Sequence, residues 1–392
     1  MKLRRTIVVS LGLCVTAALA CNETKNATSS GLASSSSSSS SGGGSTSSSG
    51  SSGLPATHDN GLVPQDSPWR TGSEWYRNVE TAPVAEHSSE MLQALVRWGT
   101  TGVFQIDFSF VVLDGTGGAN VNFPQGEETD NVPVPVPAKG YIEGGHAYDA
   151  CPVDSEDCHM LVLVPGAKRL YETYQTRRNG STWEGAVTMW QLDKLYPRSN
   201  RGQGCTSADA AGMAITPGLI GYREAKSGTL AHALRLVIRN DYIRGKAGDK
   251  NVPNVAYPAS HGSTAGAAAT GLPYGARLRL KPSVKEGDPR FKSAGAKTIL
   301  RALHRYGMIV ADGGNIPLMA ESDRVYKDSD PKETWEGTLG PRDLDGILPS
   351  DFEVIAIPKD RPGGPVGGFY QSRAEYEADL KRPLGCTSIV QP

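Results

Sequence analysis

Acid–base chemistry has four candidate residues in the middle of this chain: Glu172, Asp209, His232 and Asp312. A carboxyl group can act as an acid, a base or a nucleophile, and an imidazole exchanges its proton near neutral pH. Asp209 lies among small residues that would let a ligand approach, and Asp312 follows an apolar run directly before two glycines. Cleavage of a glycosidic bond uses two carboxyl groups about 5–10 Å apart. We therefore take these four residues as the candidate catalytic groups.

Each of these residues also has a structural interpretation. His232 falls within the apolar alternation of 230–239, where a buried imidazole must have its nitrogens hydrogen-bonded. Asp209 is also typical of a turn or a helix cap, and Asp312 of a turn. Glu172 suits the solvated face of a strand equally well. Both interpretations remain open for every one of the four.

Ligand binding has a second set of candidates: His261, Arg277, Arg279 and Trp183. His261 begins a Gly/Ala-rich stretch, 262–271, that could act as a lid over a site. The two arginines share one face of an expected strand and could hold an acidic sugar through bidentate hydrogen bonds. Trp183 could stack on a sugar ring. A surface loop, a solvated strand face and core packing explain the same residues.

Signatures of other chemistries are absent from the sequence. There is no G-x-S-x-G nucleophile elbow, no phosphate-binding GxxxxGK[ST] loop and no HExxH zinc motif. The chain has no CxxC pair, and the spacing of its cysteines fits no zinc pattern. We therefore expect neither a metal site nor a cofactor.

Short strands should position most of the candidate residues. Alternating or apolar runs predict strands at 103–113, 159–164, 169–176, 183–192, 230–239, 276–281 and 308–311. Helices are expected at 88–98, 293–307, 343–352 and 373–381. The sequence thus predicts an α+β, β-rich fold with few helices, built as an antiparallel sandwich or a barrel-like sheet.

The N-terminus has the pattern of an export signal. Residues 1–20 carry three basic residues, an apolar stretch and small residues before Cys21, which predicts a signal peptide rather than a spanning helix. The ending Ala18-Leu19-Ala20-Cys21 is similar to the lipobox of bacterial lipoproteins, and that resemblance implies lipidation of Cys21. An ordinary signal peptide with an incidental cysteine is the alternative. By the same resemblance, Asn22 is compatible with an outer-membrane destination.

The remaining chain divides into a linker and a body. Residues 21–53 are dominated by Ser and Gly and have nothing apolar to bury, so we expect a disordered tether. Residues 54–392 are long enough for a single large domain, with a possible sub-boundary near 140–150. Four cysteines remain in this body, and among three possible pairings we favour Cys151–Cys158 and Cys205–Cys386.

Four segments between residues 159 and 313 form a distinctive set: HMLVLVPGAKRLYETY at 159–174, TSADAAGMAITPGLI at 206–220, the G-x-x-x-H-A-L core within 224–236, and ILRALHRYGMIVADG at 299–313. Together they resemble a family of secreted, largely uncharacterised bacterial proteins. The resemblance implies a glycan or cell-surface setting and assigns no reaction.

We therefore expect a surface-anchored, glycan-active enzyme, a polysaccharide hydrolase or lyase that uses carboxylates and His. The alternative is a non-catalytic lipoprotein that binds carbohydrate or the cell wall. Expected partners are a polysaccharide or cell-surface glycan, and a membrane reached through the lipid anchor. Nucleic acid is not an expected partner, because 40 basic residues are balanced by 41 acidic ones and no basic run occurs.

Overall fold

Short strands and loops make up most of the computed structural model. The structure describes residues 61–124, 129–153, 156–196, 204–245, 254–262, 266, 268–361, 374, 375 and 378. All of them belong to one unit that spans Gly50–Pro392. The predicted signal peptide, the lipidated Cys21, the Ser/Gly tether and Cys386 lie outside the described residues, as does most of the helix predicted at 373–381.

The described strands form three sheets. The strands are β1 (Ile106–Phe110), β2 (Val112–Asp114), β3 (Ala119–Val121), β4 (Val134–Val136), β5 (Met160–Val164), β6 (Arg169–Asn179), β7 (Thr182–Gln191), β8 (Leu234–Ile238), β9 (Arg277–Leu280), β10 (Met308–Gly313), β11 (Leu318–Glu321) and β12 (Phe352–Val354). Six of them pair in the order β1-β11-β8-β10-β9-β12, four in the order β2-β5-β6-β7, and β3 pairs with β4.

Helices are few and short. The α-helices are α1 (Trp69–Gly72), α2 (Ser88–Ala94), α3 (Tyr222–Ser227), α4 (Ala294–Arg305) and α5 (Arg324–Lys327), and the 3-10 helices are η1 (Glu74–Tyr76), η2 (Glu143–Gly145), η3 (Thr216–Gly218), η4 (Asn240–Tyr242) and η5 (Pro349–Asp351). Among the helices of the described residues only α4 exceeds two turns, and the predicted Ser293 caps it by accepting a hydrogen bond from Ala296 N at 3.1 Å. The predicted α+β, β-rich fold with few helices is confirmed.

The arrangement of the strands differs from the predicted antiparallel sandwich or barrel. Both larger sheets are mixed. In the six-stranded sheet β8 pairs parallel with β10 whereas β10 pairs antiparallel with β9, and in the four-stranded sheet β2 pairs parallel with β5 whereas β5 pairs antiparallel with β6. No described sheet closes on itself. The physical reason is that β10 enters between β8 and β9. Alternation of side chains identifies a strand, but it carries no information about the direction of its neighbours.

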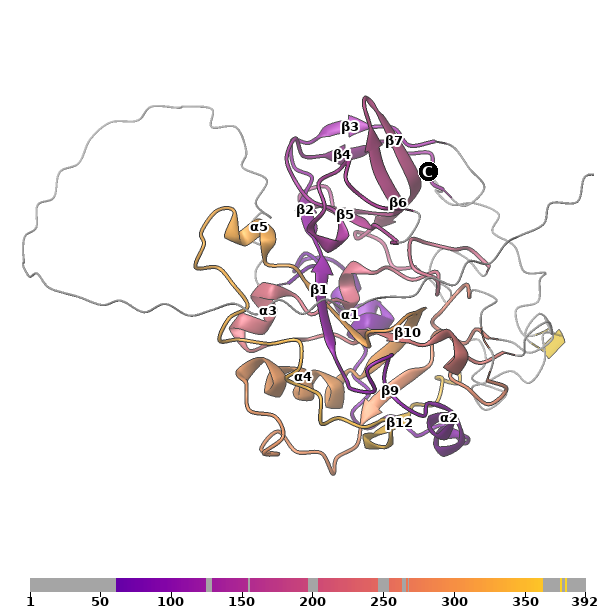
Figure 1. The fold of residues 1–392 in the computed structure, drawn as a ribbon. Helices are drawn as coiled ribbons and strands as arrows, with labels where there is room; N and C mark the ends of the chain where they lie inside the picture. The colour runs from indigo at the N-terminus through magenta and orange to yellow at the C-terminus, as the bar shows by residue number, and fades with distance from the viewer. Residues whose placement is uncertain are drawn as a thin grey trace, which may run out of the picture. The chain divides into compact units, whose positions relative to one another are not determined.

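The run predicted as one strand at 103–113 is two strands that belong to different sheets. β1 pairs with β11 and β2 pairs with β5, so the chain passes from one sheet to the other at Val111 (Figure 1). Phe110 packs into the main core, and Val111 packs into a second, smaller core between the four-stranded and two-stranded sheets. This crossing point matters because charged residues from several segments meet beside it.

Three local predictions have clear outcomes. Cys151 and Cys158 form the predicted disulfide, with their Cα atoms 6.1 Å apart. The helix predicted at 343–352 is wrong, since turns and η5 precede β12 there. The strand predicted at 230–239 begins only at Leu234.

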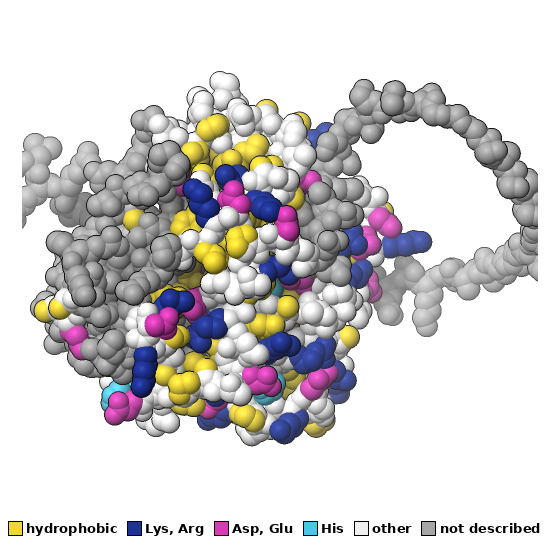
Figure 2. All heavy atoms as spheres, turned by 180° about the vertical axis from the view of Figure 1, so that it is seen from behind, with side chains coloured by type: hydrophobic (Ala, Val, Ile, Leu, Met, Phe, Trp, Pro, Cys, Tyr) yellow, Lys and Arg dark blue, Asp and Glu magenta, His cyan; other side chains and the backbone are white. Residues whose placement is uncertain are grey.

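The surface of the described residues mixes charges of both signs. Figure 2 shows basic and acidic side chains interspersed among hydrophobic ones on the face opposite to that of Figure 1. No helix in the described part of the chain has the length and apolar character needed to cross a membrane.

Candidate functional site

A buried arginine joins two of the predicted carboxylates. Arg235, in β8, donates from Nε to Asp209 Oδ2 at 3.2 Å and from Nη2 to Asp209 Oδ1 at 2.8 Å. The same Nη2 donates to Asp312 Oδ2 at 2.7 Å. The side chains of Arg235 and Asp209 are 2% and 0% exposed, whereas that of Asp312 is 19% exposed. The structure thus brings Asp209 and Asp312 together, and only Asp312 reaches the surface.

Backbone contacts explain why these groups meet. Asp312 lies near the end of β10, which pairs with β8 in the register Asp312–Val237. The loop that carries Asp209 is held against β10 by a hydrogen bond from Ala211 N to Ala311 O at 2.9 Å. Ser207 Oγ accepts from the backbone nitrogen of Asp209 at 3.0 Å, and so fixes the turn that aims the carboxylate.

A histidine–glutamate pair lies directly beside Asp209. His159 Nδ1 donates to Glu143 Oε2 at 2.7 Å, and its Nε2 donates to Ala208 O at 3.0 Å. Because both ring nitrogens face acceptors, the imidazole carries two protons. Burial opposes that charge, but Glu143 outweighs burial and raises the pKa of His159 to about 9. The side chain of Glu143, in η2, is 20% exposed.

We name Glu143, His159, Asp209, Arg235 and Asp312 the charged cluster. Its two surface carboxyl groups have opposite pKa shifts. Burial raises the pKa of Asp312 to about 6; Arg235 opposes this shift and repulsion from Asp209 adds to it. Burial also opposes ionisation of Glu143, but His159 outweighs it and lowers the pKa of that carboxyl group. In weakly acidic solution Asp312 can therefore carry a proton while Glu143 stays ionised.

Half-buried and exposed polar groups surround the charged cluster. Ser109, in β1, donates to Asp107 Oδ2 at 2.7 Å, and its Oγ lies 3.4 Å from Glu143 Oε1. The ring of Tyr174, in β6, lies 5.7 Å from that of His159. Asp157, two residues before His159, is exposed, and Asp312 repels it. Hydrogen-bonding and acidic side chains thus lie between the charged cluster and solvent.

Glu172 is buried rather than solvated. Its Oε2 accepts from Trp190 Nε1 at 2.9 Å and from Ile215 N at 3.0 Å, and its Oε1 accepts from Thr216 N at 2.7 Å. Burial raises the pKa of this carboxyl group. Glu172, in β6, therefore holds the segment around Ile215 and Thr216, which follows Asp209 in the chain. In this way it helps to position the loop that carries Asp209.

His232 lies in a bend before β8 and not within the predicted strand, because pairing with β10 begins at Leu234. The imidazole is buried. Its Nε2 lies 3.2 Å from Glu224 Oε2, and its Nδ1 donates to Ala233 O at 2.9 Å. Burial opposes protonation, but Glu224 raises the pKa of His232. Both nitrogens are thus hydrogen-bonded, away from the charged cluster.

The face of β9 that carries the two predicted arginines is covered instead of open. Arg277 Nη2 lies 3.2 Å from Glu74 Oε2, and Arg279 Nε donates to Glu353 Oε1 at 2.9 Å. Arg279 Nη1 also donates to Glu80 O and Ala82 O, both at 2.9 Å. The expectation that this face binds ligand or faces solvent is corrected, since the segment around residues 74–82 packs over it.

Trp183 and His261 lie in different surroundings. Trp183, in β7, packs against Tyr148 with ring centroids 5.2 Å apart, inside the smaller core, so its ring is not an open stacking surface. His261 is half-buried, and its Nδ1 donates to Ala210 O at 2.9 Å. It therefore borders the loop of Asp209, while residues 263–265 and 267 of its Gly/Ala-rich stretch lie outside the described residues.

Sequence reasoning missed three members of the charged cluster: Glu143, His159 and Arg235. Two of them carried a signal. Arg235 interrupts the apolar run Leu234–Ile238, and His159 directly precedes the apolar strand Met160–Val164. A charged residue inside or next to a buried strand must have a partner. In the described part of the chain, no group of three or more His, Cys, Asp and Glu side chains is arranged to hold a metal ion.

The ion pair of His159 predicts how stability depends on pH. Its pKa is about 9 in the folded protein against an ordinary value of 6.5. The contribution of this pair to stability is therefore complete below pH 6.5 and is lost as the pH rises through about 9. We expect the free energy of unfolding to fall by a few kcal/mol over that range.

Chemical denaturation at pH 6 and pH 9.5 tests this expectation. Between these two pH values the free energy of unfolding should fall much less in His159→Gln than in wild type. In the control His146→Gln it should fall as much as in wild type, because His146, which is 30% exposed, pairs with Glu156 on the surface. Equal pH dependence in wild type and His159→Gln would show that the pair does not stabilise the fold.

Comparisons with known proteins do not assign the chain to a family. No protein-family model, curated protein or solved structure matches the chain. The functional assignment therefore rests on the geometry of the charged cluster.

Proposed function

We propose that this protein is a surface-anchored lipoprotein that hydrolyses glycans, with Asp312 as the proton donor and Glu143 as the ionised partner. One observation carries the proposal. Two carboxyl groups reach the surface from the same buried cluster, and their surroundings shift their pKa values in opposite directions. Glycosidases use such a pair, one carboxyl group protonated and the other ionised.

The proposed reaction assigns a separate task to each group. Asp312 gives its proton to the oxygen of the scissile glycosidic bond, and that bond breaks with its electron pair on the leaving oxygen. The carboxylate of Glu143 either stabilises the positive charge that develops on the sugar or activates the attacking water. Arg235, already 2.7 Å from Asp312, stabilises the aspartate that remains. Water then supplies the hydroxyl group and returns a proton to Asp312.

Hydrolysis fits the charged cluster better than lyase chemistry. A lyase must remove a proton from carbon, which needs a base with a free lone pair. His159 uses both ring nitrogens as donors. Burial and the neighbouring carboxylates raise the pKa of Tyr174, which disfavours the phenolate. The groups best suited to act in this cluster are thus the two carboxyl groups.

A panel assay tests the proposal. The mature chain is incubated with neutral polysaccharides, acidic polysaccharides and peptidoglycan, and both the release of reducing sugar and the retention of protein on the polymer are measured. Release supports the hydrolase. Retention without release supports the alternative, a non-catalytic carbohydrate- or cell-wall-binding lipoprotein.

Lipid anchoring has a test of its own. In bacterial cells fed labelled palmitate, the full chain should incorporate label and sediment with the membrane fraction, and Cys21→Ser should lose both properties almost completely, because one thiol carries the anchor. Cys14→Ser serves as the control, because it removes a thiol of the predicted signal peptide and leaves the predicted disulfides intact. Label that persists in Cys21→Ser would exclude Cys21 as the anchor.

A further inference from the structure

A pocket separate from the charged cluster opens beside η1. It has a volume of about 290 Å³, and its walls include Trp69, Trp75, Tyr196, Tyr257, Glu74 and Arg361. None of these residues belongs to the charged cluster. Gly218 separates the two places, since a Cβ atom there would lie 2.6 Å from the ring of Trp75 and 2.9 Å from Arg235 Cβ.

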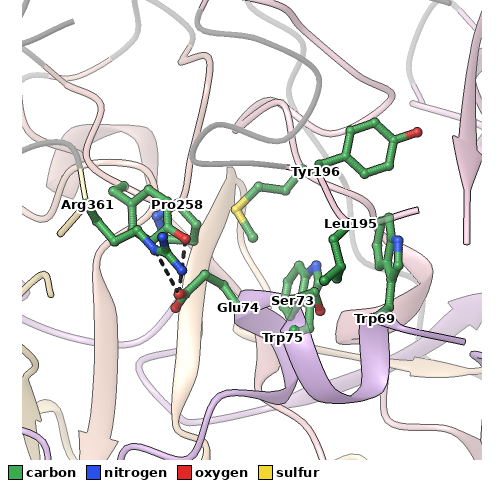
Figure 3. Close-up of a pocket in the computed structure, with 11 residues that line it drawn as sticks. Trp69, Ser73, Glu74, Trp75, Leu195, Tyr196, Pro258 and Arg361 are labelled. Atoms are coloured by element: carbon green, nitrogen blue, oxygen red, sulfur yellow. Dashed lines mark hydrogen bonds and ion pairs between the residues drawn. The ribbon is translucent and has the colours of Figure 1, made fainter. Parts of the chain in front are cut away.

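The pocket has an apolar side and a charged side. Figure 3 shows Trp69, Leu195 and Tyr196 along one wall, with Arg361 and Pro258 across from them and Glu74 between the two walls. The rings of Trp69 and Tyr196 pack edge to face at 5.7 Å, which fixes the aromatic wall. A rigid apolar wall that faces a few polar groups is the usual construction of a small-molecule site.

Positive charge is in excess around the single carboxylate of the pocket. Glu74 Oε2 lies 2.6 Å from Arg77 Nε and 3.2 Å from Arg277 Nη2, and Tyr257 donates to Glu74 Oε1 at 3.0 Å. Burial opposes ionisation of Glu74, but Arg277 and Arg77 lower its pKa. Two buried or half-buried cations thus already neutralise this carboxylate before Arg361 is counted.

Arg361 is the cation best placed to receive an anion. Its Nε is 4.0 Å from Glu74 Oε1, and among the described residues it also pairs with Asp360, whose side chain is 72% exposed. Such a solvated pair is weak. The guanidinium of Arg361 stands 5.7 Å from the ring centre of Tyr257, which holds it at the edge of the pocket.

A further polar group of the pocket lacks a partner. Ser73 Oγ is buried without a hydrogen bond, and the buried side chain of Trp75 lines the pocket beside it. A ligand rich in hydroxyl groups would satisfy Ser73 Oγ, because each hydroxyl donates and accepts. The pocket therefore combines a flat aromatic wall, an unsatisfied hydroxyl group and an accessible cation.

We propose that this pocket binds one acidic sugar unit, a hexuronic acid, with its carboxylate on Arg361 and its ring against the aromatic wall. The volume suits a single ring with part of its neighbour. A neutral sugar would bring no negative charge to Arg361, and an aromatic acid would leave Ser73 Oγ without a hydrogen bond. The inference stands on the pocket alone and does not depend on the reaction proposed for the charged cluster.

Calorimetric titration of the mature chain with a trimer of galacturonic acid and with galactotriose tests the inference. We expect the acidic trimer to bind at least about tenfold more tightly than the neutral one, and Arg361→Ala to weaken its binding by about tenfold or more. Leu195→Trp, at a position 49% exposed in the free protein, should block the pocket without disturbing the fold. Arg342→Ala, 58% exposed and paired with Asp345, is the matched control and should bind like wild type.

Three results of this titration would contradict the inference about the pocket. Equal affinity for the two trimers, no binding of either, or unchanged binding in both Arg361→Ala and Leu195→Trp would overturn the inference. Because binding is measured without turnover, a failure here leaves the proposed hydrolase untouched. Equally, an absence of glycan cleavage leaves this pocket standing.

Discussion

Replacing Asp312 by Asn is expected to lower the rate of glycan cleavage by about 10²–10⁴-fold, the usual contribution of a general acid. The amide keeps the shape of the side chain and can still lie beside Arg235, but it cannot release a proton to the leaving oxygen. Because Asp312 is partly exposed, the fold should survive the change. The initial rate of reducing-sugar release, measured on the polymer that wild type cleaves, checks the expectation.

The test variants Asp312→Asn and Glu143→Gln each have a matched control at a surface carboxylate. Asp193→Asn removes a surface carboxylate that pairs with Arg169 at 2.8 Å and should leave the rate unchanged. Glu143→Gln should lower the rate strongly, whereas Glu184→Gln, at an exposed pair with Arg177, should not. If Asp312→Asn cleaves as fast as Asp193→Asn, Asp312 is not the acid.

Replacing Arg235 by Met is expected to reduce the free energy of unfolding by roughly 3–5 kcal/mol, because it leaves the fully buried Asp209 without its cation. Urea denaturation monitored by tryptophan fluorescence measures the change. The double variant Arg235→Met/Asp209→Leu should recover part of the loss, since it also removes the unpaired charge.

Arg239→Met is the control for the arginine. This residue directly follows β8 and pairs with Asp241 at 2.8 Å on the surface, where an ion pair contributes about 0–1 kcal/mol. A loss in Arg235→Met no larger than that in Arg239→Met would mean that the Asp209–Arg235–Asp312 bridge does not hold the site together.

Much of the local structure could be predicted from the sequence, because local structure depends on neighbours along the chain. The cap of α4 at Ser293 and the pairing of Cys151 with Cys158 followed from short-range patterns. The passage between sheets at Val111 did not, because the apolar run continues through the break and marks no boundary between the two strands. Such a break is decided by packing against strands that lie far away in the sequence, at residues 160–164 and 318–321.

The candidate site was predictable only in part. Asp209 and Asp312 were recognisable as carboxylates in unusual surroundings. Arg235 and His159 were recognisable only as charged residues in or beside apolar strands, and the sequence did not show that these two aspartates are their neighbours. The arginines of β9 were expected to bind ligand or face solvent, and this expectation was wrong. The segment that buries Arg277 lies two hundred residues earlier in the chain, so the local sequence gives no sign of it. A pattern of alternation shows which residues share a face, but it does not show what covers that face.

The pH dependence of glycan cleavage tests the central claim most directly. If Asp312 is the acid and Glu143 the ionised partner, the rate should fall as the pH rises through about 6, where Asp312 loses its proton. On the acid side it should fall only below pH 4.5, the ordinary value for glutamate, because His159 lowers the pKa of Glu143. In Asp312→Asn the fall near pH 6 should vanish from the residual activity. A rate that keeps rising above pH 7, or an unchanged fall near pH 6 in Asp312→Asn, would contradict the assignment.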